Sequence, residues 1–397
     1  MKKISKILTI VIIMFILCGC NNYQEINNYA IVSGISIDAD DKDPSKYQVG
    51  VQIMNAKKEE ESENSLITFY KSTGDTLYEA LSKIMLDSPK ELYLGHTEIV
   101  IISDDLLRKK DPLNYLDYFM RDAEVEKDPL LMIAKDDPAY DVLKIITPLE
   151  TIPTRNIKST ISVANNFSGS IAMVTLDQFL SDLINDGREP ILPSITITGN
   201  VKKGEKMDNI AESDPNTKVK FNTLGYFKNN KLKGYLTNDE SVGYVFLANI
   251  QKENFVNVKC DDKNFASIRI SKSSVEDKIS FENGKPKVEV SFNVKAKLLE
   301  YNCKADFVKD DKAVRELAKK AEDKIIKLAK KTTDKLYREE NTDALKYGAK
   351  FYQQKYKEMK KYGYKINEIA NDITFDFKSK VSIESTELSI KSVKEDK

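Results

Sequence analysis

The stretch Tyr29-Ala-Ile-Val-Ser-Gly-Ile-Ser-Ile-Asp38 alternates apolar residues with small or polar ones, which is the pattern of a half-buried β-strand. A second stretch of this kind, Tyr47–Met54, follows an acidic turn, and the two together predict a hairpin. The apolar runs at 98–103 and 130–134 predict buried strands, with helical patterns between the strands. Because strands alternate with helices, we expect residues 25–150 to form a compact α/β unit.

The rest of the chain keeps mixed helical and strand patterns. One clear helical pattern covers 176–185, and residues 255–301 are strongly β, with Asn283-Gly284 as a hairpin turn signal. Apolar residues at three- and four-residue spacing then predict two long amphipathic helices, the second over 342–361, before a final strand at 373–390. The predicted fold class is therefore α+β, or mixed α/β, with mixed sheets and long C-terminal amphipathic helices. The inward face of the second helix is expected to comprise Phe351, Tyr352, Tyr356 and Met359.

The composition is that of an ordinary globular protein and argues against several functions. The 397 residues include 62 basic and 62 acidic side chains, one histidine and no tryptophan. A net charge of zero gives no footprint for binding nucleic acid. Because His96 is the single histidine, a zinc site built from histidines is nearly excluded, and histidine-based acid–base chemistry depends on one position.

The first twenty residues have the features of a lipoprotein signal peptide. A basic beginning is followed by the eleven-residue apolar run 7–17, which is too short to cross a hydrocarbon core about 30 Å thick. Leu17-Cys18-Gly19-Cys20 then has the pattern of a bacterial lipobox. We expect residues 1–19 to be removed and Cys20 to carry two or three lipid chains such as palmitate, which would hold the protein on a membrane. The alternative is an ordinary secretory signal with incidental cysteines.

Two further cysteines, Cys260 and Cys303, remain in the predicted mature chain. In an exported protein this pair could form a disulfide worth roughly 4 kcal/mol in the chain-entropy model. The alternative is two unpaired buried thiols, because the sequence does not place their Cα atoms.

Motifs for catalysis and for cofactor binding are missing from the sequence. We find no Gly-rich phosphate loop, no Gly-x-Ser-x-Gly, no Ser-x-x-Lys and no His-Glu-x-x-His. The acidic turn at 38–43 lacks the glycine and the closing glutamate of a calcium loop. We interpret His96 as a structural residue, and we predict no catalytic residue, no metal site and no cofactor.

Several segments of the chain together form a pattern that begins at the lipobox. It continues through Glu25-Ile26, Ala30-Ile-Val-Ser-Gly-Ile-Ser-Ile-Asp38, Leu94-Gly-His-Thr-Glu-Ile-Val-Ile-Ile102, Leu116-Asp-Tyr-Phe-Met-Arg-Asp122, Gly187-Arg-Glu-Pro-Ile-Leu-Pro193 and Leu224-Gly-Tyr-Phe-Lys-Asn-Asn-Lys-Leu-Lys-Gly234. The order and spacing of these segments resemble the Ger(x)C family, the C-subunit lipoproteins of spore germinant receptors (GerAC-, GerBC- and GerKC-like). One departure is Asn21-Asn22, because family members often carry Trp-Asp directly after the lipid-bearing cysteine.

This resemblance implies a non-enzymatic, three-domain extracytoplasmic lipoprotein on the outer face of the spore inner membrane. It implies two integral membrane partners, the A and B subunits, and a role in nutrient-triggered germination; it leaves direct binding of a small-molecule germinant open. The expected domains are an N-terminal α/β domain at 20–195, a β-rich middle domain at 196–270, and a C-terminal domain at 271–397. Two other functions stay open: an extracytoplasmic solute-binding lipoprotein, and a membrane-anchored enzyme using His96 or a carboxylate pair.

The expected lipid on Cys20 can be tested by mass spectrometry of the protein extracted from membranes. We expect a chain that begins at Cys20 and carries the added mass of diacylglyceryl and acyl groups. An unmodified Met1, or a free N-terminal Asn21, would contradict the lipoprotein prediction.

Overall fold

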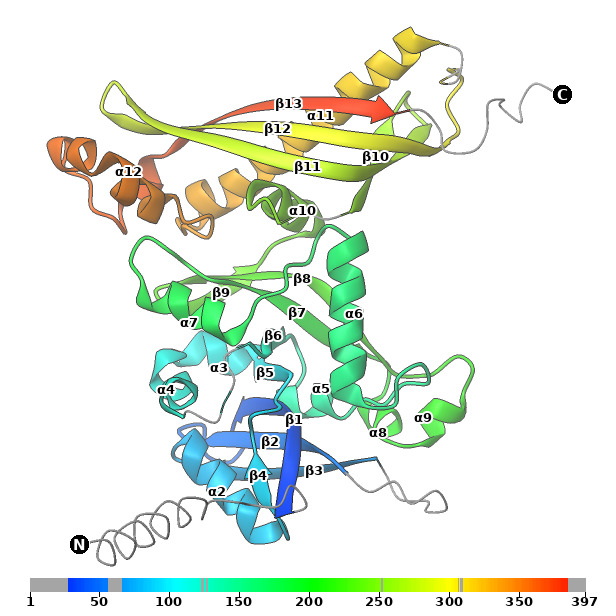
Figure 1. Ribbon diagram of the computed structural model, residues 1–397, viewed down its shortest axis with the longest axis vertical. Helices are drawn as coiled ribbons and strands as arrows, with labels where there is room; N and C mark the ends of the chain where they lie inside the picture. The colour runs from blue at the N-terminus through cyan, green and yellow to red at the C-terminus, as the bar shows by residue number, and fades with distance from the viewer. Residues whose placement is uncertain are drawn as a thin grey trace, which may run out of the picture.

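The computed structural model describes residues 28–55, 66–122, 125, 128–250, 253–305, 307 and 310–384. The described chain builds two β-sheets that follow one another along the long axis of the molecule (Figure 1). A single buried helix, α10 (Asn238–Leu247), lies between them.

The first sheet has the strand order β3-β2-β1-β5-β6-β7-β8-β9, with β4 paired to β1. Its centre is parallel, because β1, β5, β6 and β7 run in one direction, and the hairpin strands on either side are antiparallel. The strands are β1 (Tyr29–Ala39), β2 (Tyr47–Met54), β3 (Ile67–Gly74), β4 (Glu91–Tyr93), β5 (Ile99–Ser103), β6 (Leu130–Ala134), β7 (Ile191–Thr198), β8 (Lys218–Lys228) and β9 (Lys231–Tyr235).

Helices cover both faces of the first sheet, which explains why its central strands are continuous apolar runs. Val100 of β5 and Leu131 of β6 face α2 (Leu77–Asp87), α3 (Asp104–Lys109), α4 (Leu113–Arg121) and α7 (Leu176–Ile184). The neighbouring residues Ile101 and Met132 point to the opposite face, against α5 (Ala139–Leu143) and α6 (Pro153–Phe167). Two short helices, α8 (Val201–Gly204) and α9 (Asp208–Ala211), precede β8.

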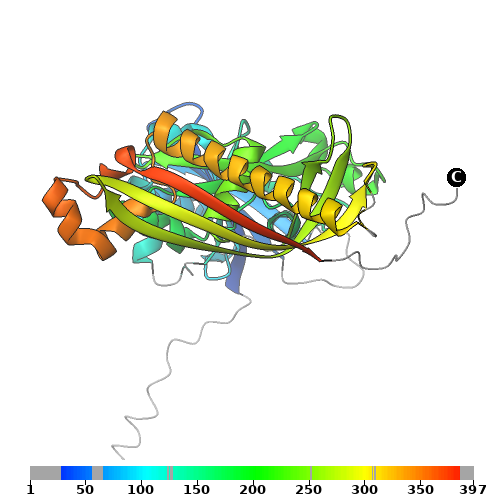
Figure 2. The same ribbon diagram turned by 90° about the horizontal axis from the view of Figure 1, so that it is seen from above.

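The second sheet has the order β10-β11-β12-β13 and a buried and a solvated face. Its long hairpin turns at Asn283-Gly284, where both residues have positive φ, as a two-residue turn of this kind requires. Helix α11 (Asp311–Thr333) runs along the sheet (Figure 2). The strands are β10 (Asn254–Lys259), β11 (Phe265–Glu282), β12 (Lys285–Tyr301) and β13 (Thr374–Glu384); the π-helix η2 (Asp334–Glu339), α12 (Tyr347–Tyr362) and the 3₁₀ helix η3 (Ile369–Asp372) lie between α11 and β13.

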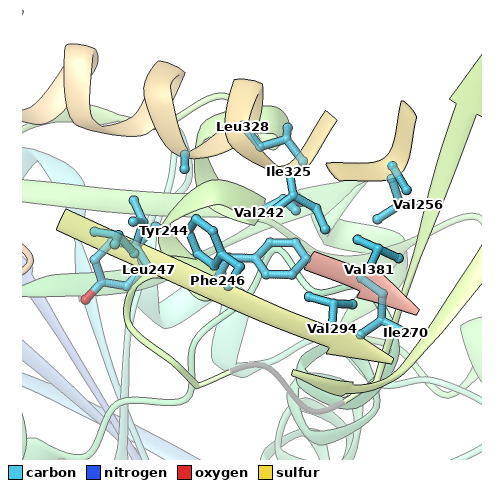
Figure 3. Close-up of a cluster of buried hydrophobic side chains, with 14 of the residues drawn as sticks. Val242, Tyr244, Phe246, Leu247, Val256, Ile270, Val294, Ile325, Leu328 and Val381 are labelled. Atoms are coloured by element: carbon cyan, nitrogen blue, oxygen red, sulfur yellow. The ribbon is translucent and has the colours of Figure 1, made fainter. Parts of the chain in front are cut away.

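We call the part of the molecule from α10 to β13, which contains the second sheet, the second half, and the part before it the first half. The core of the second half is built around α10, which is buried on all sides from Ser241 to Leu247. Phe246 meets Phe292 of β12 edge-to-face with ring centroids 6.2 Å apart, and Val242 lies beside Ile325 and Leu328 of α11 (Figure 3). The same cluster contains Leu224 and Tyr226 of β8. The apolar core of the second sheet therefore reaches into the first sheet.

The structure confirms the predicted mixed α+β class and corrects several local predictions. The expected inward face at 351–359 is wrong in part: Phe351 and Met359 are buried, but Tyr352 and Tyr356 are 46% and 50% exposed and pack against each other. Helix α6 was not predicted, and the second long helix begins at Tyr347, not at residue 342. The predicted domain ranges stay predictions, although two of their boundaries, 195/196 and 270/271, fall inside β7 and β11.

The opening strand ends on a buried carboxylate that helps to hold the first sheet to α5. Asp38 accepts hydrogen bonds from the backbone N–H groups of Ala139 (2.7 Å) and Tyr140 (3.0 Å), at the first turn of that helix. Desolvation raises the pKa of Asp38 from 3.8 to about 6, against the lowering effect of these hydrogen bonds.

The raised pKa of Asp38 predicts a specific dependence of stability on pH. The folded state binds more protons than the unfolded state between pH 3.8 and about 6, so the free energy of unfolding falls as pH rises through this window. Asp38 alone should lower the free energy of unfolding by about 2–3 kcal/mol across this window, and we expect this decrease to be absent in Asp38→Asn. The measurement is chemical denaturation of both proteins at a series of pH values. Parallel pH profiles for the wild type and the variant would contradict the prediction.

Candidate functional site at the junction of the two sheets

Three loops meet where the first sheet joins the second half of the molecule. They are the loop from α7 to β7, the tight turn between β8 and β9, and the loop from η2 to α12. Together with η3 they surround a polar cavity of about 350 Å³. Its lining includes Arg188, Glu189, Asn229, Asn341, Asp343 and Asn367.

Asp343 is the centre of this junction. Its side chain is buried, and its carboxylate accepts hydrogen bonds from the hydroxyl of Tyr337, from the backbone N–H of Tyr347 (2.9 Å) and from the backbone N–H of Gly348 (2.5 Å). Burial raises the pKa of Asp343, while these donors act in the opposite direction. The carboxylate thus ties the end of η2 to the start of α12, where the N–H groups of a helix have no partner within the helix.

Backbone hydrogen bonds cross the junction directly. The N–H of Glu189 donates to the carbonyl of Asp343 (3.2 Å), and the N–H of Ala349 donates to the carbonyl of Gly187 (3.1 Å). Gly187 has φ +71°, and a Cβ there would lie 2.5 Å from the backbone nitrogen of Ala349. A larger residue at 187 is excluded by both the backbone conformation and the close approach of the two chains.

The β8–β9 end of the first sheet makes a second set of contacts with the same loop. The hydroxyl of Thr342 donates to the carbonyl of Phe227 (2.5 Å), and the ammonium of Lys228 donates to the carbonyl of Glu340 (3.3 Å). An ion pair joins Lys346 to the largely buried Asp182 of α7 at 2.6 Å. The loop thus contacts both β8 and α7 of the first sheet's half, through hydrogen bonds and an ion pair that oppose separation of the two halves.

A second polar surface lies at the carboxyl ends of the parallel strands, the edge at which open α/β sheets commonly bind ligands. A cavity of about 340 Å³ there is lined by acidic residues that include Asp38, Asp104, Asp105, Asp136, Asp137 and Asp141. No group of three or more histidine, cysteine or acidic side chains in the described ranges is arranged to hold a metal ion. Asp38 and Asp137 instead accept backbone N–H donors, so their carboxylates serve the fold.

Among the residues singled out in the sequence, Cys260, Cys303 and His96 lie away from the junction. Cys20 is outside the described residues. Cys260 and Cys303 form a disulfide with their Cα atoms 6.1 Å apart, beside the second sheet. His96 is exposed in the loop between β4 and β5. Within the part of the chain that the structure describes, no helix is both long and apolar enough to cross a membrane.

The junction could be found in the sequence only indirectly. Two of the segments that carry the family resemblance, 187–193 and 224–234, lie far from residues 340–346 in the chain. The structure brings both segments to the loop at 340–346. Asp343 itself gives no sequence signal, since it is an ordinary polar residue at the start of the second helix predicted over 342–361. Its role depends on contacts with residues that are distant in the sequence.

Comparison with known proteins decides the family. The model for the spore germination protein N-terminal domain matches residues 22–197, and the model for the spore germination B3/GerAC-like C-terminal domain matches residues 222–387. The chain belongs to the Ger(x)C family of spore germination proteins. The family predicted from the sequence is thus confirmed.

Individual members of the Ger(x)C family resemble the chain over most of its length. Spore germination protein KC of Bacillus subtilis (strain 168) is 27% identical over 290 residues, which are 71% of each chain. Spore germination protein B3 of the same organism is 24% identical over 348 residues, covering 86% of this chain and 87% of that protein. The crystal structure of the GerBC protein superimposes with a TM-score of 0.57 at 20% identity, over 88% of this chain and 96% of that one, and shows the same fold.

The buried carboxylate at the junction gives a direct mutational prediction. In Asp343→Asn, an NH₂ group replaces one of the two carboxylate oxygens. In either orientation of the amide, this NH₂ donor faces one of the buried N–H or O–H donors, so at least one hydrogen bond is lost. We expect the free energy of unfolding to fall by about 1–3 kcal/mol, measured by chemical denaturation. The matched control is Asp372→Asn, which makes the same change at an exposed carboxylate at the end of η3 and should have little effect. Equal stability of the two variants would contradict the role given to Asp343.

Proposed function

We propose that this chain is a non-catalytic lipoprotein subunit of a spore germinant receptor, required for nutrient-triggered germination. The observation that carries the proposal is the match of two spore germination family models, which together cover most of the chain. In this account the acylated Cys20 holds the protein on the outer face of the spore inner membrane. Its integral membrane partners are the receptor's A and B subunits.

The junction supports a role in positioning partners. A subunit that acts through contact surfaces needs those surfaces at fixed relative positions, and the loop at 340–346 connects the two halves by backbone hydrogen bonds and an ion pair. The apolar cluster around α10 connects them a second time. The first sheet, which follows the expected anchor in the chain, then presents the second sheet at the far end of the long axis (Figure 1).

The fold argues against a solute-binding lipoprotein. Such a protein binds its ligand between two similar α/β lobes, whereas among the residues that the structure describes only the first sheet has helices on both faces. The second sheet has one solvated face, and β12 pairs with an antiparallel β11 and a parallel β13. Backbone hydrogen bonds from Glu189 to Asp343 and from Ala349 to Gly187 join the two halves beside the cavity. These hydrogen bonds would have to break for a cleft to open.

The proposed function can be tested in the native spore-former. We expect deletion of the gene, in a strain without compensating paralogues, to abolish germination triggered by the matching nutrient, measured as loss of optical density of a spore suspension. Germination by a trigger that bypasses nutrient receptors should be unchanged, which controls for damaged spores. A Cys20→Ala variant should reproduce most of the loss, because the protein would no longer be held beside its partners. Full nutrient germination in the deletion strain would contradict the proposal.

A further inference from the structure

A set of apolar side chains is exposed at the end of the first sheet where β1 begins. Leu86 is 83% exposed, and Tyr93, Leu66 and Met85 are 40%, 38% and 36% exposed. We call these four residues the tip patch. Isolated exposed apolar residues need no explanation, but a group that gathers at one place on a molecule indicates a binding surface.

The strand register places the tip patch at one end of the sheet. Ile31 of β1 is paired with Tyr93 of β4 on one side and with Met54 of β2 on the other, and Met54 is paired with Ile67, which follows Leu66. Met85 and Leu86 lie in the last turn of α2, which ends at Asp87, and β4 begins at Glu91. In Figure 1 the beginning of β1 and one end of α2 lie together at the end of the molecule opposite the second sheet.

The chain itself limits how far this surface can lie from the expected lipid. Tyr29 begins β1, and its ring packs against that of Tyr93 with centroids 5.6 Å apart. Tyr29 follows Cys20 by nine residues, which span at most about 30 Å when fully extended. With Cys20 acylated, the tip patch is therefore held near the bilayer surface whatever path the connecting residues take.

We propose that the tip patch inserts into the interfacial region of the bilayer, as a second membrane contact beside the lipid on Cys20. The proposal rests on the proposed lipid anchor. The side chains fit this environment, because tyrosine has an apolar ring with a polar tip and is enriched at membrane–water interfaces, and leucine and methionine can enter the acyl boundary. Exposed charges around the patch are mixed, with Lys90 between Asp87 and Glu91, so the contact is apolar and does not depend on anionic lipid.

Insertion of the tip patch fixes the orientation of the molecule. With the beginning of β1 at the bilayer, the long axis points away from the membrane and the second sheet is the most distant part (Figure 1). The lipid alone is a single contact with the bilayer and does not fix the direction of the long axis. Two contacts at one end restrict that tilt and present the same faces to neighbouring subunits at all times.

The absence of tryptophan from the chain allows a clean test, because a single introduced indole is a site-specific fluorescent probe. We would reconstitute the mature acylated protein into phosphatidylcholine vesicles, with and without brominated acyl chains that quench indole emission on contact. The probe is Tyr93→Trp, and the matched control is Tyr352→Trp, since Tyr352 is 46% exposed and packs on Tyr356 much as Tyr93 packs on Tyr29.

We expect the Tyr93→Trp protein to show emission at shorter wavelength and a large loss of emission in brominated vesicles, and the Tyr352→Trp protein to show neither. Adding Leu86→Asp to the Tyr93→Trp protein should remove most of the quenching, while flotation with the vesicles is retained through the lipid. Equal quenching of the two single variants, or none in the Tyr93→Trp protein when it floats, would overturn the tip-patch proposal and leave the anchor standing. Failure of the acylated protein to float would overturn the anchor and the patch together.

Discussion

The loop that links the first sheet to the second half of the molecule depends on one buried carboxylate. Asp343 accepts three donors from the two elements on either side of it, and its own backbone carbonyl accepts the N–H of Glu189 from the other half of the protein. A buried carboxylate is costly unless such donors surround it. The loop at 340–346 is therefore held in one conformation, and the contacts that it makes with β8 and with α7 follow from that conformation.

The segments matched by the two family models are joined through the main chain of a single sheet. The first family model ends at residue 197, within β7, and the second begins at residue 222, within β8. These two strands pair with each other, so the segment matched by the second model adds β8 and β9 to the sheet built by the first. From β9 the chain passes directly into α10 and the core of the second sheet. Separation of the two matched segments would break the pairing of β7 with β8, and separation of the two sheets would expose the apolar surface around α10.

Sequence patterns predicted the elements well where a local period or a turn signal decided the structure. The strands at 47–54 and 130–134 and the turn at Asn283-Gly284 depend on alternation, continuous burial and a positive φ, all of which can be read locally. The turns predicted the partners in two hairpins, β1 with β2 and β11 with β12, but nothing local predicted the order of the parallel strands at the centre of the first sheet. The exposure of Tyr352 and Tyr356 could not be predicted either, because the helical period does not say how wide a stripe the neighbouring sheet covers. Asp343 escaped prediction for the same reason, since its donors belong to its folded surroundings.

We expect the two sheets to move as one body, because the junction holds the second sheet in a fixed position relative to the first. Amide hydrogen exchange at Glu189 and Ala349 tests this claim most directly, because these N–H groups donate across the junction, to the carbonyls of Asp343 and of Gly187. If the halves move only as one body, these amides exchange with the same opening free energy as those of β5 and β12. Exchange at the junction that is much faster than in both sheets would show that the halves separate while each stays folded, and would contradict the account.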